Sequence, residues 1–419
     1  MEIKIPNLTG ILTSIASFEY TILKIHQNMG VIVHTITAQQ QPVEIDLMPF
    51  HYLSTIVETT FGSAAVVVGA LIGHYTQKGI SNYFKKRKEQ PSRVLKRTIK
   101  SNKKNATKSI DKATKFVFDN RKKDGLWYDF SSKHHGESSY WISSFVGLNL
   151  LDLDPWNIRI KDTAKELVKY QEKDGGFSYS NLASSDSDST AFAIRFLSEF
   201  GYEQEVYKAK KFLDKHQNSD SGFGTYLEEK VRKDYDSRIP KEESLDGWIS
   251  STADITTSAL LANPDNKKAV KFLLDSQQED GRWRSYWWNN DIYATVHAIE
   301  VLSKLGYKSQ VKKAGDWLSK EENISDIPFY LALATQGMIR SEESYDKINS
   351  CVEELLSSQR KDGSWNSYDI LRFPSHSNTE PWVNKSRWRE DAKDQNRLLT
   401  TSTCIRALSD YKTIDNNIF

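Results

Sequence analysis

One short motif recurs along the C-terminal three quarters of the chain and constrains its fold more than any other feature. Each copy has Gln or Arg, two variable residues, Asp, then Gly or Ser, one further residue and an aromatic side chain. The copies occupy 121–127, 171–177, 217–223, 277–283 and 359–365. The interval between Asp280 and Asp362 has room for two units, and we place a degenerate copy at 317–326. Self-similarity at such a period indicates a repeat architecture, here of six units.

Two kinds of helix are predicted to alternate along these units. The Asp-Gly step favours a turn that tolerates positive φ, so one helix ends before it and another follows the aromatic residue. The helices before the turn are apolar on one stripe only and include 164–171, 209–217, 269–277 and 351–359. The helices after it are more apolar and are predicted at 139–151, 188–200, 251–261, 291–302, 327–338 and 398–411. Amphipathic helices outside and apolar helices inside predict an all-α fold, an (α/α)6 toroid over 105–412.

The motif resembles the QW repeat of squalene and terpene cyclases, which the β subunits of protein prenyltransferases carry in weaker form. The resemblance covers roughly 300 residues and implies the toroid of that superfamily. The repeat itself is structural. We expect its Gln side chain to meet exposed amides at a helix end while the aromatic ring packs over it.

The stretch "SSDSDSTAFAIRFL", at 184–197, begins the second of the predicted inner helices. Asp186 fits the N-cap position, since carboxylates there accept free backbone amides. Asp188 then lies in the first turn, near the positive end of the helix dipole. Helix capping alone is therefore one complete explanation of both acids.

A second explanation comes from resemblance, because "DSDSTA" is similar to the DxDDTA motif of class II, protonation-initiated terpene cyclases. The resemblance implies that Asp188 is the general acid that protonates an alkene or epoxide, with Asp186 as the first Asp of the motif. Ser189 stands where the family has its last Asp, so no neighbouring carboxylate comes from that position. In this interpretation Asp186 and Ser189 support Asp188, whose conjugate base needs hydrogen-bond donors in a dry site.

Carbocation chemistry also needs a cavity walled by aromatic rings, which stabilise a cation and exclude water. We predict Trp141, Phe192, Trp248 and Tyr293 in that role, with ordinary core packing as the alternative. Asp254 and Asp291 occupy similar early positions in their helices. We predict that they join Asp188 at one rim of the toroid and bind substrate, although a capping role would explain each one singly.

Two insertions, 225–248 and 369–397, interrupt the repeat, and long loops on one face of a toroid often carry function. Their cations are candidates to grip a diphosphate, and we take Arg387 as the substrate-binding one. The alternative is that they are solvated charges paired with interleaved acids. The six cations are Arg232, Lys233, Arg238, Lys385, Arg387 and Arg389.

Other chemistries find little support in the sequence. Neither Cys351 nor Cys404 has the Asp neighbour of the prenyltransferase zinc site, so we expect no metal. No acidic pair for magnesium-diphosphate ionisation, Gly-rich phosphate loop or GxSxG elbow stands out, and we expect no cofactor. The net charge of +2 gives no field that would recruit nucleic acid. Two cysteines fit a reducing compartment, and Cys404 and His297 lie in apolar helices as expected core residues.

The N-terminal segment, 1–95, is predicted to be a separate small unit without a secretory signal. Residues 59–77 carry no charged side chain, and a membrane span needs about 20 apolar residues. The sequence leaves two interpretations of 59–77 open: a membrane span or in-plane anchor, and a buried helix of a small domain. The basic run that follows would place the toroid in the cytoplasm. We interpret 85–108 as a basic linker, either a solvated hinge or a segment attracted to anionic lipid.

These observations predict a cytoplasmic, metal-independent, class II cyclase-like enzyme that acts on a polyprenyl chain or its diphosphate at the inner face of the membrane. The competing hypothesis is a toroid that only binds a lipid, a peptide or a protein partner, anchored by its N-terminal segment. A prenyltransferase-like subunit with a helical partner comes third, because its zinc ligands are absent from the sequence. A closed, aromatic-lined cavity under Asp188 favours the enzyme, and an open, charged mouth favours the binding module.

Overall fold

The computed structural model describes residues 32–33, 43–44, 93–132, 136–234, 239–323, 325–383 and 392–414. The chain divides into two units, Met1–Gln90 and Pro91–Phe419. In the first unit β1 (Ile32–Val33) and β2 (Val43–Glu44) pair antiparallel. The apolar segment 59–77 lies outside the described residues. Of the helices that the structure does describe, none has both the length and the apolar character to cross a bilayer.

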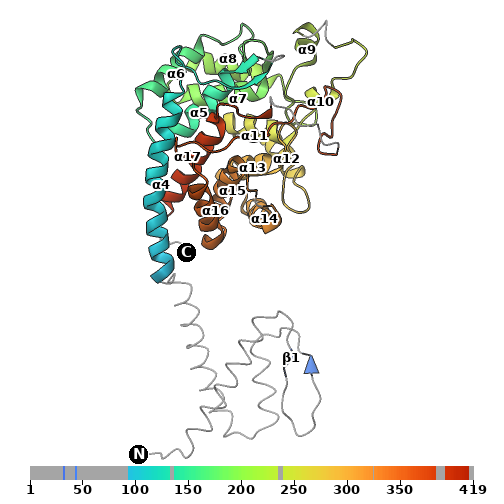
Figure 1. The fold of residues 1–419 in the computed structure, drawn as a ribbon. Helices are drawn as coiled ribbons and strands as arrows, with labels where there is room; N and C mark the ends of the chain where they lie inside the picture. Colours follow the sequence, from blue (N-terminus) through green and yellow to red (C-terminus); the bar gives the residue numbers. More distant parts are fainter. Residues whose placement is uncertain are drawn as a thin grey trace, which may run out of the picture. The chain divides into compact units, whose positions relative to one another are not determined.

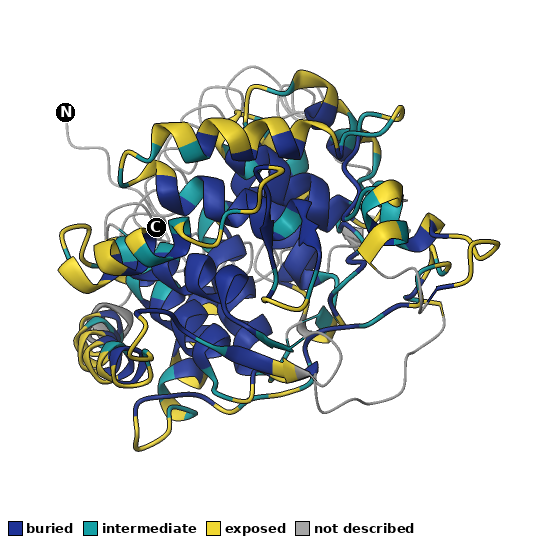
Figure 2. Ribbon diagram, turned by 90° about the horizontal axis from the view of Figure 1, so that it is seen from above, coloured by how far each residue is buried: buried dark blue, intermediate teal, exposed yellow. Residues whose placement is uncertain are grey.

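The second unit consists of two concentric rings of helices (Figures 1 and 2). The inner helices are α5 (Tyr140–Leu151), α7 (Ser187–Ser198), α11 (Ala253–Ala262), α13 (Ile292–Lys304), α15 (Pro328–Arg340) and α17 (Leu398–Thr413). The outer helices are α4 (Arg93–Asp119), α6 (Ile158–Val168), α8 (Glu203–Asp214), α12 (Lys267–Asp275), α14 (Lys308–Leu318) and α16 (Tyr345–Ser357). Each inner helix packs on the next, and α17 packs back on α5. The predicted (α/α)6 toroid is confirmed.

The burial of each ring follows from its sequence. In α13 every residue from Ile292 to Leu302 is buried, including the polar Thr295, His297 and Glu300, because the helix lies in the inner ring. In α6 the buried residues are Ile160, Thr163, Ala164 and Leu167, which form one helical stripe. Figure 2 shows the result, with buried inner helices at the centre and exposed faces on the outer ring.

The first outer helix corrects the sequence interpretation. Residues 93–108, taken as part of a basic linker, belong to α4, which runs to Asp119 and packs on α17 and α16. Ile99, Asn102, Ala106 and Ile110 are buried at intervals of three or four residues. The many lysines between them hide this stripe from a reading based on composition.

The repeat motif forms a turn that connects neighbouring outer helices and has similar hydrogen bonds in several copies. In one copy Gln171 Nε2 donates to the carbonyl oxygens of Gly175, at 2.9 Å, and Glu205 in α8, at 2.8 Å. Gln277 and Gln359 make the same two kinds of bond. These bonds are all donated by the side-chain nitrogen, whereas a contact with helix-end amides would be made by the side-chain oxygen, so that expectation stays a prediction. The aromatic residue of the 277–283 copy is buried, and the Trp283 indole donates to Leu273 O at 2.7 Å.

The degenerate copy at 317–326 retains its helices although it has lost the motif. α14 ends at Leu318, a 3-10 turn η1 (Glu321–Asn323) follows, and α15 begins at Pro328. Asn323 Nδ2 donates to Trp317 O at 2.8 Å and holds this turn. The predicted sixth unit is present.

Short hairpins and bridges complete the toroid. β3 (Asp129–Ser132) pairs with β4 (Gly136–Ser138), and β5 (Phe177–Ser178) pairs with β6 (Ser185–Asp186). The Asp129 carboxylate accepts the N–H groups of Asn396 and Leu398, both at 2.8 Å. These bonds connect the first repeat of the toroid to its last repeat. The first insertion contains α9 (Glu228–Asp234) and α10 (Asp246–Ile249).

Candidate active site

The start of α7 holds Asp186 and Ser189 in a closed pair. Asp186 is the N-cap, as predicted, and its two oxygens accept the backbone N–H and the hydroxyl of Ser189, both at 2.7 Å. The β5–β6 pairing places Asp186 opposite Phe177 and so fixes the entry into the helix. Burial raises the pKa of Asp186 to about 7, against the effect of its bonds from Ser189. The Ser189 hydroxyl thus donates its hydrogen bond to Asp186.

Asp188 lies in the first turn of α7, as predicted, and its side chain lines a cavity. Burial raises the pKa of Asp188 to about 7, and the nearby Asp186 and Asp254 carboxyls add to the rise. The Ser258 hydroxyl and the Trp141 indole act in the opposite direction. A carboxyl group in this state keeps a proton to donate near neutral pH.

The cavity has a volume of about 400 Å³ and aromatic walls. The predicted Trp141 and Trp248 both line it, together with Trp287 and Trp288. Its other lining residues are Tyr179, Ala183, Asp186, Asp188, Ser189, Thr225, Tyr226, Ile255, Leu371, Arg372, Phe373, Pro374 and Ser375. An acid set among ring faces is the environment in which a developing carbocation is stabilised.

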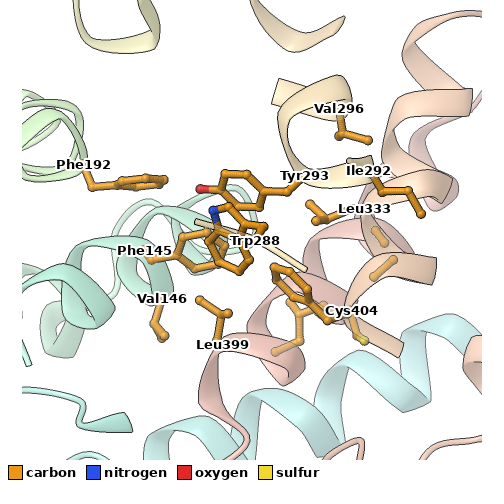
Figure 3. Packing of buried hydrophobic residues seen from close by; sticks show 14 of the residues in the cluster. Phe145, Val146, Phe192, Trp288, Ile292, Tyr293, Val296, Leu333, Leu399 and Cys404 are labelled. Carbon is orange, nitrogen blue, oxygen red and sulfur yellow. The ribbon is translucent and has the colours of Figure 1, made fainter. Parts of the chain in front are cut away.

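Phe192 and Tyr293 are buried against lining residues rather than on the cavity surface. The Phe192 ring meets Trp141 edge-on at 6.1 Å, and Tyr293 stacks on Trp288 at 3.7 Å. Figure 3 shows Phe192, Trp288 and Tyr293 gathered with Phe145. The buried Tyr293 hydroxyl has no hydrogen-bond partner among the described residues. Both residues thus support the wall from behind in this structure.

Asp254 positions the wall instead of facing the cavity. It is buried in the first turn of α11, and its Oδ2 accepts the backbone N–H groups of Tyr286, at 2.8 Å, and Trp287, at 2.9 Å. The Trp287 indole then donates to Thr225 at 2.8 Å. Burial raises the pKa of Asp254, and the amide bonds oppose that rise. Asp254 therefore holds the backbone of the segment that carries Trp287, one of the aromatic residues of the cavity wall.

Asp291 has a different set of partners. It stands at the N-cap position of α13, where its Oδ1 accepts the Ser285 N–H at 3.0 Å. Its Oδ2 pairs with Arg284, at 3.0 Å, and Arg282, at 3.1 Å. The structure thus brings Asp188 and Asp254 within electrostatic range of each other, while Asp291 lies in an arginine cluster and does not line the cavity.

Both insertions reach the cavity, but not through the cations singled out in the sequence. Arg232 donates to the carbonyls of Pro240, at 3.0 Å, and Glu243, at 2.6 Å, and pairs with Glu228, so it braces its own loop. Lys233 is exposed. The candidate Arg387 lies outside the described residues, as do Arg238, Lys385 and Arg389.

The cation that does line the cavity, Arg372, was missed by the sequence analysis. It lies in "ILRFP", at 370–374, where apolar neighbours flank a single charge, whereas the predicted cations lie in charged runs. A lone Arg in an apolar segment is a signal of burial against something polar, and Arg372 is only 8% exposed. Tyr179 and Tyr226, also missed, carry no comparable signal.

In the described ranges, no group of three or more His, Cys, Asp or Glu side chains is placed to hold a metal ion. Cys404 and His297 are buried core residues, as expected. His297 bonds through Nδ1 to Tyr293 O at 2.9 Å, and burial lowers its pKa to about 4.

Comparison with protein families agrees with the fold and the repeat. Residues 100–240 match the model described as the prenyltransferase alpha-alpha toroid domain, and residues 177–326 match the squalene-hopene cyclase C-terminal domain. The toroid is of the squalene-hopene cyclase and prenyltransferase type. The resemblance drawn from the QW-like motif is thereby confirmed.

Two curated relatives each match about half of the chain. The squalene–hopene cyclase of Bradyrhizobium diazoefficiens is 23% identical over 242 residues, which cover 47% of this chain and 36% of that protein. The drimenyl diphosphate synthase of Streptomyces showdoensis is 24% identical over 251 residues, which cover 53% and 44%. The chain spans less than half the length of either relative.

Solved structures share the same toroid. A protein from Actinoplanes superposes with a TM-score of 0.68 and 26% identity, over 74% of this chain and 100% of that one. The type II terpene cyclase MstE from Scytonema, in complex with geranylgeranyl dihydroxybenzoate, gives a TM-score of 0.66 at 20% identity, over 74% and 99%. The fold is that of a class II terpene cyclase.

Proposed function

We propose that the cavity is the active site of a protonation-initiated cyclase that acts on a polyprenyl chain or its diphosphate. Asp188 donates the proton, and Asp186 with Ser189 fixes the start of the helix that presents it. Trp141 and Trp248 shape the wall for the cationic intermediate. The observation that carries the proposal is a carboxyl group with a raised pKa on the surface of an aromatic-lined cavity.

The relatives support this reading at the level of the toroid. The MstE chain, which is named a type II terpene cyclase, is covered over 99% of its length by part of this chain. The squalene–hopene cyclase among the curated relatives points in the same direction.

The test compares purified protein with an Asp188→Asn variant. Each is incubated with geranylgeranyl diphosphate, farnesyl diphosphate, squalene and oxidosqualene, and products are identified by mass spectrometry. We expect a cyclised product from at least one substrate and a loss of at least about 100-fold in the variant. Glu203→Gln is the matched control, because Glu203 also lies in a first helical turn but is exposed on α8.

One observation favours the binding-module alternative. The Ser189 hydroxyl donates to Asp186, so it does not replace the carboxylate that the family places beside the acid. Absence of product from all four substrates, with ligand binding retained in Asp188→Asn, would support a toroid that only binds an isoprenoid or another lipid.

Location and partners extend this proposal. We propose that the protein is cytoplasmic and that 59–77 attaches it to the inner face of a membrane, where a lipid substrate is concentrated. Cell fractionation of the full chain and of a chain with two charges introduced into 59–77 tests this. Recovery of both in the soluble fraction would contradict membrane attachment, and co-purification would reveal a protein partner.

A further inference from the structure

Arg372 is built into the cavity wall by both its backbone and its side chain. Its N–H donates to Trp287 O at 2.7 Å, and its Nη1 donates to Ser285 O at 3.1 Å. The neighbouring Leu371, Phe373 and Ser375 also line the cavity. Because a guanidinium group has five N–H donors, most of its hydrogen-bonding capacity is left for whatever occupies the cavity.

The charge of Arg372 has no close counterion in the described part of the chain. Ion pairs within 4.0 Å are made by its neighbours Arg282 and Arg284, both to Asp291, but not by Arg372. Asp254, the other nearby carboxylate, is occupied by two amides. A buried cation costs free energy unless it is paired, so this position favours an anion in the cavity.

The cavity therefore has two chemically different walls. Asp186 and Asp188 stand on α7, while Arg372 stands on the second insertion, with aromatic rings making up much of the remaining surface. A molecule with an anionic end and an apolar tail satisfies both. Its charged end meets the guanidinium, and its apolar part lies among the rings toward the acid.

The volume limits the length of that tail. At roughly 30 Å³ for each group the size of a water molecule, about 13 such groups fill the space. The cavity itself measures about 400 Å³. Counted without its head group, a tail of three isoprene units has about 15 such groups and is close to this size, and a chain of six units is about twice too large.

We infer that the cavity takes an isoprenoid of about three units whose anionic head, a diphosphate or a carboxylate, pairs with Arg372. This inference rests on the proposed function, since it specifies the substrate of the same site. It assigns to Arg372 the role that the sequence analysis gave to Arg387 and its neighbours, and it disfavours an uncharged hydrocarbon such as squalene.

Binding to Asp188→Asn protein tests the inference without turnover. Farnesyl diphosphate, farnesoic acid, farnesol and squalene are titrated while tryptophan fluorescence is recorded. We expect at least one of the two anions to bind at least about tenfold more tightly than farnesol, and the stronger of the two identifies the head. Equal affinity for farnesol and both anions would overturn the inference.

Second variants locate the charge. When Arg372→Gln is added to Asp188→Asn, we expect the affinity for the anion to fall to the affinity for farnesol. When Arg372→Lys is added instead, we expect the affinity for the anion to be partly retained. Arg232→Gln, in the other insertion and outside the cavity, should leave binding unchanged. An unaltered affinity in Arg372→Gln would refute the assignment, and if that variant fails to fold, the comparison of head groups and the Lys variant decide.

The outcome is separable from that of the proposed function. Tight anion binding without any product from the native protein would reject the cyclase and keep the inference. Efficient cyclisation of squalene with no preference for anions would keep the cyclase and reject the inference. Geranylgeranyl diphosphate, titrated in the same way, tests the tail length, and binding more than tenfold tighter than that of farnesyl diphosphate would overturn it.

Discussion

Asp188 holds its proton near neutral pH because its carboxyl group is buried next to two other acids. As a general acid it works only in the protonated form. The pKa of about 7 therefore predicts that kcat/KM is highest below pH 7 and falls about tenfold per unit above it. A pH–rate profile with the active substrate measures this, and a rate that rises through pH 7 to 9 would contradict the role of Asp188 as acid.

The same residue makes folding stability depend on pH. A carboxyl whose pKa is raised in the folded state stabilises the protein below its ordinary pKa, and this contribution disappears as pH rises through 7. Asp188→Asn should therefore gain stability relative to the parent between pH 4 and 8, by on the order of a few kcal/mol. Urea denaturation at several pH values measures the difference. Glu203→Gln should show no such trend. If the free energies of unfolding of the parent and of Asp188→Asn change in parallel with pH, Asp188 does not have the raised pKa.

At the scale of the element, the repeat turn depends on left-handed backbone at one position. Gly125, Gly175, Gly281 and Gly363 have positive φ there, whereas the third copy has Ser221 with φ of 76°. Because a residue with a Cβ atom is strained in this region, Ser221→Gly should stabilise the protein by about 0.5–1 kcal/mol.

The matched change in another copy should act in the opposite direction. A Cβ atom on Gly281 would lie 2.3 Å from the Lys313 carbonyl oxygen, at a φ of 104°. Gly281→Ala should therefore destabilise by more than about 1 kcal/mol. Thermal unfolding of both variants provides the test, and a shift of the same sign in the two would show that backbone strain does not govern this turn.

The elements themselves were largely predictable. Local sequence pattern is enough to predict the apolar helices at the centre, the Asp186 cap and the sixth, degenerate unit. The repeat strengthens these predictions because the same pattern occurs in several copies. α4 was missed because its lysines dominate the composition, although Ile99 and Ile110 lie on a buried stripe. The donor role of Gln171 toward Glu205 O depends on a helix 34 positions away.

For the whole molecule, one ionic cluster ties three inner helices together. Glu300 on α13 pairs with Arg195 on α7, at 3.4 Å, and with Arg406 on α17, at 3.3 Å. Burial alone would raise the pKa of Glu300, but Arg406 and Arg195 outweigh it and hold that pKa well below its usual range. The stabilisation is therefore present above the ordinary pKa of Glu and is lost only in strong acid.

Removing this carboxylate leaves two buried guanidinium groups without their counterion. Glu300→Gln should lower the free energy of unfolding at pH 7 by about 3–5 kcal/mol, whereas Glu203→Gln on the outer ring should change it by less than about 1 kcal/mol. Chemical denaturation compares the two. A loss below 1 kcal/mol in Glu300→Gln would mean that the cluster does not hold the ring.

The sequence by itself determined the toroid, the division into inner and outer helices, and the places of Asp186 and Asp188 at the start of α7. Those features depend on hydrophobic periodicity and helix-end chemistry, which act over a few residues. Only the tertiary structure decided that Arg372 lines the cavity, that Asp254 anchors the cavity wall, and that Asp291 pairs with two arginines. Closing the ring brings those segments together from distant parts of the chain, and no local pattern encodes which of them will meet.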